Sequence, residues 1–202
     1  GWTDTSVQFG LNGYALVALK LDSDGYRTGT NNLEVDSNGK PKSATAEFGG
    51  ALRAKYNKTE ALLGNQFPNN PIVGTNYSRL LPSMSTGLSI KDNSFDHLNL
   101  DFGYFTQMSP VDSTDRLNYF NTDYNNGIQA DSVSYLGGTY KLNNIETSLY
   151  VSELENVWMQ YYVGAKYKHQ IDAQSGFNLQ TNNYINRDTG DATGGNISTG
   201  LV

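Results

Sequence analysis

Long runs of this sequence alternate between apolar and polar residues with a period of two, and this pattern constrains the fold more than any other feature. In the first run the apolar side holds Val7, Phe9, Leu11, Gly13, Ala15, Val17 and Leu19. A period of two is the side-chain period of a β-strand, in which successive residues point to opposite faces. Helical periodicity is not sustained anywhere in the chain, so the sequence predicts an all-β protein.

About nine such runs are present, and most span about 8 to 12 residues. The later ones cover about residues 47–56, 60–63, 86–91, 98–105, 132–142, 145–152, 161–168 and 177–182. Short turns such as Asn57-Lys58 and Asn143-Asn144 alternate with long polar loops. Strands of this kind, with tyrosines near their ends, are typical of a transmembrane antiparallel β-barrel of the outer membrane. Lipid leaves no backbone polar group unpaired, so strands cross it only as a closed sheet.

Composition agrees with this interpretation once the alternation is considered. The mean hydropathy of −0.53 suggests a soluble domain, but an average conceals apolar residues that share one face. The longest apolar run, residues 15–19, is too short for a spanning helix. The absence of cysteine excludes disulfides and thiolate metal sites, and the net charge of −6 disfavours nucleic acid as a partner. No signal-peptide pattern is present, so we expect a mature, trimmed chain.

The segment of about residues 65–84 interrupts the alternation. Pro68, Pro71 and Pro82 remove backbone donors, and Gly74 permits a positive φ, so neither a helix nor a strand ladder is expected there. The segment is nevertheless apolar, and its apolar side chains are Phe67, Ile72, Val73, Tyr77, Leu80 and Leu81. We therefore expect it to fold inward and narrow a cavity, with Arg79 facing what passes.

If the apolar faces meet lipid, the opposite faces line an interior that is more basic than acidic. The strand positions on that side are Lys20, Arg53, Lys55, Lys91, Lys141, Lys166 and Lys168 against Glu47, Glu60, Asp101 and Glu146. A basic lining in a narrow passage concentrates anions and holds carboxylates. The sequence thus predicts a preference for small anionic or zwitterionic solutes.

Several of these assignments leave alternatives open. Arg53 and Lys55 share a face in what is predicted to be mid-strand, which favours a role in the lumen. Lys20, Lys91 and Lys168 are equally well explained as solubility residues at strand ends. Arg116 is either a lumen residue or half of an external salt bridge. Tyr162 either narrows the pore or belongs to the outer aromatic girdle, if the register is off by one.

No pattern for covalent chemistry is present. The nucleophile-elbow, zinc-protease, P-loop and dinucleotide-binding motifs are all absent. His97 and His169 share no ligand spacing, and residues 22–25 resemble a calcium loop only superficially, because the glycine is misplaced. Glu153 and Glu155 lack an acid or base neighbour. We expect no enzyme activity and no cofactor.

Several segments resemble the OprD family of substrate-specific outer-membrane porins of Gram-negative bacteria such as pseudomonads and Acinetobacter. They are Leu19-Lys20-Leu21-Asp22, Gly49-Gly50-Ala51, Ser78-Arg79-Leu80-Leu81-Pro82, Glu153-Leu154-Glu155, Gln160-Tyr161-Tyr162 and residues 194–198. The resemblance implies a monomeric barrel of about 18 strands, whose third extracellular loop folds inward, with a ladder of basic residues that guides carboxylates. The segment 65–84 corresponds to that loop, Arg79 to its arginine, and Arg53, Lys55 and Arg116 to basic positions. Thr139, Met159 and Leu62 depart from the basic pattern, which implies a thinner ladder and a different substrate.

We expect residues 1–202 to be a single segment, the middle portion of a longer barrel in the bacterial outer membrane, in contact with lipid and lipopolysaccharide. The predicted function is passive, selective uptake of small carboxylate-bearing solutes such as amino acids or aromatic acids. The candidate residues of the solute path are Arg79, Ser78, Tyr77, Arg53, Lys55, Arg116, Tyr162 and Lys166. The alternatives are a barrel that serves as an enzyme or adhesin, and a soluble β-sandwich that binds a ligand.

Overall fold

The computed structural model describes residues 1–21, 32–122, 127–193 and 200–201. Apart from the short 3₁₀ helix η1 (Gly190–Ala192), the regular structure in these ranges is β. No helix among them is long and apolar enough to cross a membrane. The strands are β1 (Gln8–Leu19), β2 (Ala44–Tyr56), β3 (Thr59–Gln66), β4 (Met84–Phe95), β5 (Leu98–Ser109), β6 (Phe120–Asn121), β7 (Gln129–Ala130), β8 (Val133–Leu142), β9 (Ile145–Leu154), β10 (Trp158–Gln170), β11 (Gly176–Asp188) and β12 (Gly200–Leu201).

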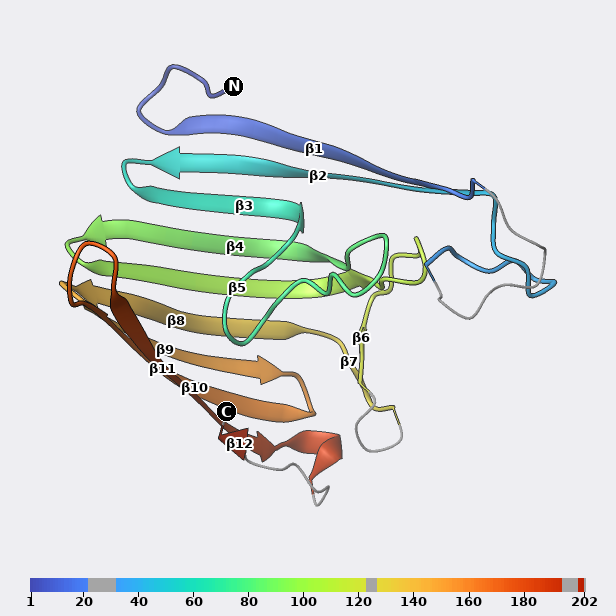
Figure 1. Ribbon diagram of the computed structural model, residues 1–202. Coiled ribbons are helices and arrows are strands. Elements are labelled where there is room, and N and C mark those ends of the chain that lie inside the picture. The colour runs from blue at the N-terminus through green and yellow to red at the C-terminus, as the bar shows by residue number, and fades with distance from the viewer. Residues whose placement is uncertain (22–31, 123–126, 194–199, 202) are drawn as a thin grey trace.

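Ten of these strands form one curved antiparallel sheet, in which each strand lies beside its neighbour in the sequence (Figure 1). The order is β1-β2-β3-β4-β5-β8-β9-β10-β11-β12, and β6 pairs with β7 in the connection between β5 and β8. The nine predicted strands are thus confirmed, and β12 adds a two-residue pairing to β11. Within the described residues, β1 and β12 are the edges of the sheet.

Some strands extend beyond the bounds predicted from the sequence. β4 continues to Phe95, although the sequence suggested a connection from residue 92, and β11 continues to Asp188, although the alternation faded at residue 182. In both places polar residues stay in the ladder because the neighbouring strand supplies backbone partners: Phe95 pairs with Leu98, and Trp158 with Asp188. Pairing, not side-chain polarity, therefore sets the strand ends.

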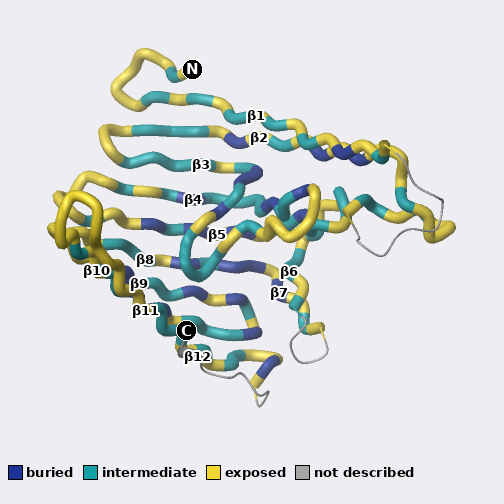
Figure 2. The backbone as a smooth tube through the Cα atoms, in the orientation of Figure 1, coloured by how far each residue is buried: buried dark blue, intermediate teal, exposed yellow. Residues whose placement is uncertain are grey.

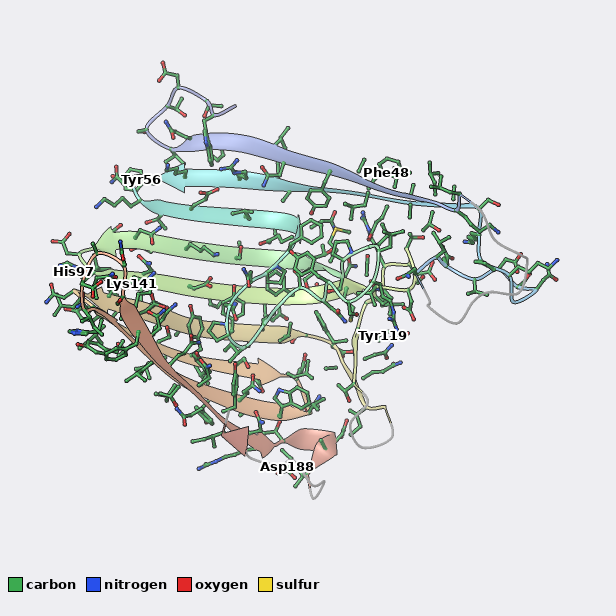
Figure 3. The ribbon with its side chains drawn as sticks, in the orientation of Figure 1. Phe48, Tyr56, His97, Tyr119, Lys141 and Asp188 are labelled. Atoms are coloured by element: carbon green, nitrogen blue, oxygen red, sulfur yellow. The ribbon has the colours of Figure 1, made fainter. Side chains whose placement is uncertain are left out.

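Tight turns gather at one end of the sheet and most long connections at the other. Asn57, His97 and Asn143 occupy the turns with positive φ angles of 53°, 64° and 51°, a conformation that asparagine tolerates better than most residues. Figure 3 shows Tyr56, His97 and Lys141 at this turn end, with Phe48 and Tyr119 at the loop end. At the loop end, a three-residue connection, residues 155–157, joins β9 to β10.

The two faces of the sheet differ as the alternation predicted. The convex, apolar face is exposed, with Leu11 at 74% and Leu63 at 55%, whereas the opposite face buries Glu47 and Tyr135 to 4% (Figure 2). In the described residues, no second sheet covers the apolar face, which a soluble β-sandwich would require. An exposed apolar face of this extent suits contact with lipid.

The inner face carries a small apolar core at the loop end. Its buried members are Phe105, Ala130, Val133, Tyr135, Leu154, Val157 and Ala192. They come from β5, β7, β8, β9 and the connections beside them, including η1. The core therefore joins the inner wall to the loops that fold over it. Asn38 and Gly39 form a turn, with Gly39 at φ 75°, whereas residues 22–25, with their superficial likeness to a calcium loop, and the stretch 194–198 lie outside the described residues.

Candidate solute path

The connection between β3 and β4, residues 67–83, lies across the inner face of the sheet and is called here the inner loop (Figure 1). Its first half closes on itself into a tip, residues 69–74, through an Asn69–Gly74 bridge. The backbone nitrogen of Thr75 donates to the Pro68 carbonyl over 2.8 Å. The Asn70 side-chain oxygen accepts from the backbone of Ile72 and Val73. Because these bonds are internal, the tip holds its shape without a regular element.

The tip packs against the far part of the wall. Ile72 and Val73 contact the apolar core, and the Tyr184 hydroxyl on β11 donates to the Pro71 carbonyl over 3.1 Å. At the root of the loop, the rings of Phe67 and Tyr14 lie 5.0 Å apart. The inner loop thus reaches from β1 to β11 across the concave side of the sheet.

The second half of the inner loop, residues 76–83, forms a separate lobe. The Ser83 backbone nitrogen donates to the Asn76 carbonyl over 2.9 Å, which joins the two ends of this lobe. Tyr77 and Leu80 are consequently exposed at 67% and 56%, so the expectation that every apolar residue of the segment packs inward is wrong for these two. Leu81, at 7%, does pack.

Arg79 and Ser78 lie on this lobe, and both are exposed. The Ser78 backbone nitrogen donates to the Asn76 side chain over 2.8 Å. Within the described part of the chain, Arg79 forms no ion pair and no hydrogen bond. Its charge is therefore uncompensated and open to solvent.

Arg53 and Lys55 lie close to the turn end of β2, not in mid-strand as predicted, because β2 ends one residue after Lys55. The Arg53 guanidinium contacts Glu60 at 2.8 Å and Asn12 at 3.2 Å, and it lies 4.0 Å above the Trp2 ring. The Lys55 ammonium is 6.0 Å from that ring. Arg53 is thus compensated by a carboxylate, whereas Lys55 carries the free charge of the pair.

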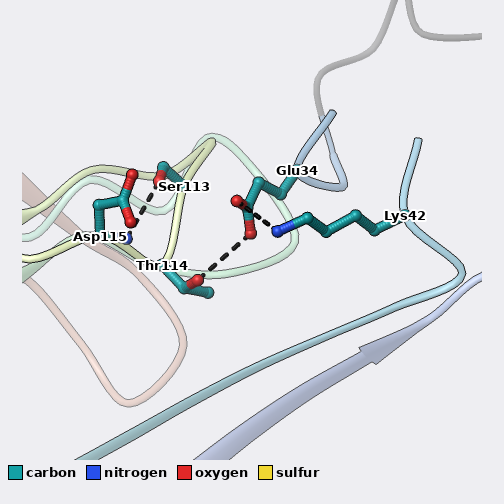
Figure 4. Close-up of polar contacts among 5 residues, drawn as sticks. All are labelled: Glu34, Lys42, Ser113, Thr114 and Asp115. Atoms are coloured by element: carbon teal, nitrogen blue, oxygen red, sulfur yellow. Dashed lines mark hydrogen bonds and ion pairs between the residues drawn. The ribbon is translucent and has the colours of Figure 1, made fainter. Parts of the chain in front are cut away.

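Arg116 lies at the loop end, in the connection after β5, and is exposed. Its guanidinium donates to the Phe48 carbonyl of β2. This hydrogen bond is to the backbone and not to an acidic side chain. Nearby, the Thr114 hydroxyl donates to Glu34 over 3.2 Å, and Glu34 pairs with Lys42 at 2.6 Å (Figure 4). These contacts fasten the loop after β5 to the β1–β2 hairpin.

Tyr162 and Lys166 both lie on the inner face of β10. Tyr162 is 6% exposed and donates to Asn182 over 2.7 Å, whereas its neighbour Tyr161 is 39% exposed on the outer face. Tyr162 therefore belongs to the inner wall and not to an outer girdle. Lys166 faces Glu146 across the β9–β10 ladder, and Glu146 forms its ion pair with Lys141 at 3.0 Å.

A cavity of about 560 Å³ lies between the root of the inner loop and the turn end of the sheet. Its charged lining residues are Lys55, Lys58, Glu60 and Lys91, accompanied by amides such as Asn12, Asn65 and Gln66. The alternation placed Lys55, Glu60 and Lys91 on the inner face, and of these only Lys55 was predicted to line the solute path. Lys58 was missed because it belongs to a turn, where the period of two ends.

One row of residues on the inner face runs in register from β2 to β11 and is called here the inner row. It consists of Lys55, Glu60, Lys91, Asp101, Gly137, Tyr150, Tyr162 and Tyr184, each paired with the next across neighbouring strands. Its first four members form a charged arc on β2 to β5, and its last three form a tyrosine arc on β9 to β11. Because barrel strands are tilted, the row rises from the turn end at Lys55 toward the loop end at Tyr184.

The charges accessible on the inner wall are mostly basic. Glu60 and Glu146 are ion-paired, and Glu47 and Asp101 are only 4% and 8% exposed. In contrast, Lys91, Lys168 and Arg79 are exposed, and Lys55 and Lys166 are partly exposed. The described residues contain no group of three acidic, histidine or cysteine side chains that could hold a metal ion.

Comparison with known proteins gives a consistent result. The family model described as "outer membrane porin, OprD family" matches residues 1–202. Porin D of Pseudomonas aeruginosa is 33% identical over 200 residues, which cover 98% of this chain and 45% of that protein. The porin-like protein GalP of Pseudomonas putida is 26% identical over 175 residues, or 85% of this chain and 42% of that protein.

Solved structures of similar fold include OccAB2 of Acinetobacter baumannii, with a TM-score of 0.89 and 29% identity over all of this chain and 51% of that one. OccK9 (OpdG) of P. aeruginosa also has a TM-score of 0.89, with 27% identity over 95% of this chain and 50% of that one. The chain spans about half the length of these relatives. Its curved antiparallel sheet is part of a transmembrane β-barrel, while the total of about 18 strands stays a prediction. Family model, relatives and fold agree that the chain belongs to the OprD family of porins of the bacterial outer membrane.

Proposed function

We propose that the full-length protein is a passive, substrate-selective channel for small carboxylate-bearing solutes, such as amino acids or aromatic acids. In this proposal the inner loop narrows the pore, and the accessible bases of the inner wall select the solute. The partners are small anionic or zwitterionic solutes inside, and lipid with lipopolysaccharide outside a monomeric barrel. No cofactor takes part.

The observation that carries this proposal is the difference in accessibility between acids and bases on the inner wall. Glu47 and Asp101 are buried, whereas Lys91 and Arg79 are exposed. A solute that passes along this wall therefore meets positive charge although the chain carries a net charge of −6. Positive charge in a narrow passage with low-dielectric walls raises the local concentration of anions.

The position of the inner loop supports the second part of the proposal. Its tip is bonded to β11, and its root packs against β1. A loop held at both sides of a concave wall occupies space in the lumen, and its lobe carries Arg79 with an uncompensated charge. We infer that Arg79 contributes to the narrowest part of the path, with Ser78 and Tyr77 beside it.

Single-channel recording of the full-length protein in planar bilayers tests this function. We expect discrete conductance steps, an anion-selective reversal potential, and block of the current by an aromatic carboxylate such as vanillate, the compound with which OpdK of P. aeruginosa was solved. Arg79→Ala is expected to weaken block by the carboxylate about threefold to tenfold, as for loss of one charged hydrogen bond partner.

Arg187→Ala is the matched control, because Arg187 is an exposed arginine on β11 two residues from the outward-facing Ile185. It removes the same charge without altering the proposed path. An absence of conductance steps would overturn the channel. Equal block in the parent, Arg79→Ala and Arg187→Ala proteins would overturn the role of Arg79.

A further inference from the structure

The tyrosine arc lies where the tip of the inner loop meets the wall. Tyr150, Tyr162 and Tyr184 are direct cross-strand partners on β9, β10 and β11. The rings of Tyr162 and Tyr184 lie 4.9 Å apart, and those of Tyr150 and Tyr162 lie 6.3 Å apart. Aromatic pairs at such separations stabilise one another beyond the area that they bury. The three rings therefore form a continuous surface on the inner wall.

Glycines on the neighbouring positions make room for these rings. A Cβ atom at Gly137 would lie 2.2 Å from the Tyr150 ring, and one at Gly164 would lie 2.3 Å from the Tyr162 hydroxyl oxygen. The rings thus lie low over the sheet and do not extend freely into the lumen. Tyr162 is accordingly only 6% exposed. Buried rings of this kind serve packing better than contact with a passing solute.

The hydroxyl groups of Tyr162 and Tyr184 have different hydrogen-bond partners. Tyr162 donates to Asn182 within the wall, over 2.7 Å. Tyr184 instead donates to Pro71, a loop residue 113 positions away in the sequence, over 3.1 Å. Pro71 belongs to the tip, and the next two residues, Ile72 and Val73, pack against the apolar core together with Tyr150.

We propose that Tyr184 is a positioning residue, which holds the tip of the inner loop against the tyrosine arc and thereby fixes the width of the pore. This inference rests on the proposed function, in which the inner loop narrows the pore. The hydrogen bond to Pro71 fixes the orientation of the tip on the wall. The apolar contacts of the tip contribute most of the free energy that holds it there. Without the bond, the tip keeps its apolar contacts but gains freedom to shift along the wall.

The test compares Tyr184→Phe with Tyr162→Phe in the full-length protein. Both variants lose one hydroxyl from neighbouring rings, but only the first loses a bond to the loop. Spin labels are attached through cysteines introduced at Gly74 and Leu179, and residues 1–202 contribute no cysteine of their own. Gly74 suits labelling because nothing lies within 4 Å of a Cβ built there, and Leu179 is 61% exposed on the outer face.

We expect a narrow distribution of label distances in the parent and in Tyr162→Phe, and a broader one with a second population in Tyr184→Phe. In single-channel records, Tyr184→Phe is expected to spend about five times longer in conductance states other than the main one, the factor for loss of one net hydrogen bond. The folded barrel is verified for both variants by heat-modifiable migration in gels.

The outcomes separate this inference from the proposed function. A broadened distance distribution in Tyr184→Phe supports the positioning role even if the channel shows no preference for carboxylates. An unchanged distribution overturns it even if carboxylates block the current. Equal broadening in Tyr184→Phe and Tyr162→Phe also overturns it, because the effect would then belong to the arc as a whole and not to the bond with the loop.

Discussion

The charged arc and the tyrosine arc occupy the same inner row of the same sheet, yet they differ in almost every physical respect. In the charged arc, Lys55, Glu60, Lys91 and Asp101 alternate in sign from strand to strand. In the tyrosine arc, three identical rings lie beside one another. Gly137 separates the two arcs, beneath the ring of Tyr150.

The difference indicates that the two arcs have separate roles on the same inner wall. Opposite charges on adjacent strands stabilise the sheet modestly, and Lys91 of the charged arc is exposed, so we expect this arc to set the electrostatic potential of the pore. The tilted and edge-on rings pack against one another and, through Tyr184, against the inner loop, so we expect the tyrosine arc to set the shape of the pore. Variants in each arc test these separate roles, and the expected effects range from a large loss of stability to a small shift in melting temperature.

Tyr162→Ala is expected to have the largest effect on stability, because Tyr162 is 6% exposed and contacts rings on both sides. Loss of a buried aromatic side chain lowers the free energy of unfolding by about 3 kcal/mol. Denaturant unfolding of the protein in lipid vesicles measures this change. Lys91→Ala, in the charged arc, is the control and should change it by less than about 0.5 kcal/mol. Equal losses would show that the two arcs do not differ in packing.

Lys55→Gln combined with Lys91→Gln is expected to have the largest effect on selectivity. Both side chains line the cavity at the turn end, and their removal lowers the anion-to-cation permeability ratio about twofold for each charge. Reversal potentials in a salt gradient measure the ratio. Tyr150→Phe, in the tyrosine arc, should leave it unchanged. If that variant shifted the ratio as much, the charged arc would not be what sets the potential.

Glu60→Gln is expected to act in the opposite direction and more weakly. It releases Arg53 from its ion pair of 2.8 Å and leaves an uncompensated cation beside the cavity. The anion-to-cation permeability ratio should therefore rise by up to about twofold, with little change in stability because the pair is partly solvated. Glu153→Gln removes an exposed acid of β9 and serves as the control. A fall in the ratio for Glu60→Gln would contradict the assignment of Arg53 to the wall of the path.

The smallest expected effect lies at the turn between β10 and β11, two strands of the tyrosine arc. The backbone N–H groups of Gln174 and Ser175 donate to Asp172 over 2.8 Å and hold the pKa of its carboxyl below the usual value. Since the folded-state pKa is lowered, the stabilisation is present above the ordinary pKa and is lost as the pH falls through the folded-state value. Asp172→Asn should therefore lower the melting temperature slightly at pH 7, and the difference should disappear as the pH falls through the lowered pKa of the Asp172 carboxyl. A difference that did not depend on pH would exclude the charge as its cause.

The sequence predicted the sheet and its two faces because both follow from the chain's own period of two. Leu11 and Leu63 are exposed outside, and Glu47 and Tyr135 are buried inside, as the alternation required. The period of two does not determine which residues of neighbouring strands pair with one another. The pairing of Lys55 with Glu60, and hence the ion pair that compensates Arg53, could not be read from either strand alone.

The inner loop was predictable as an interruption but not as a structure. Three prolines and Gly74 excluded a ladder, and the apolar residues indicated packing, which holds for Ile72 and Val73. Tyr77 and Leu80 are exposed instead, because the bonds between Asn76 and Ser83 close a separate lobe. Tyr184 was missed because β11 was predicted to end before it, and a bond across 113 positions leaves no local signal.

The shortness of β3 has a consequence for Arg116. β3 pairs with β2 only from Ala51 to Tyr56, so residues 44–50 of β2 extend past it. In this stretch, Arg116 donates to the Phe48 carbonyl, and the Asn65 side chain accepts from the Gly50 nitrogen. Backbone groups without partners are costly beside lipid. We infer that Arg116 takes the place of a strand partner for β2 at this point, and we expect its loss to impair assembly of the barrel before it changes which ions pass.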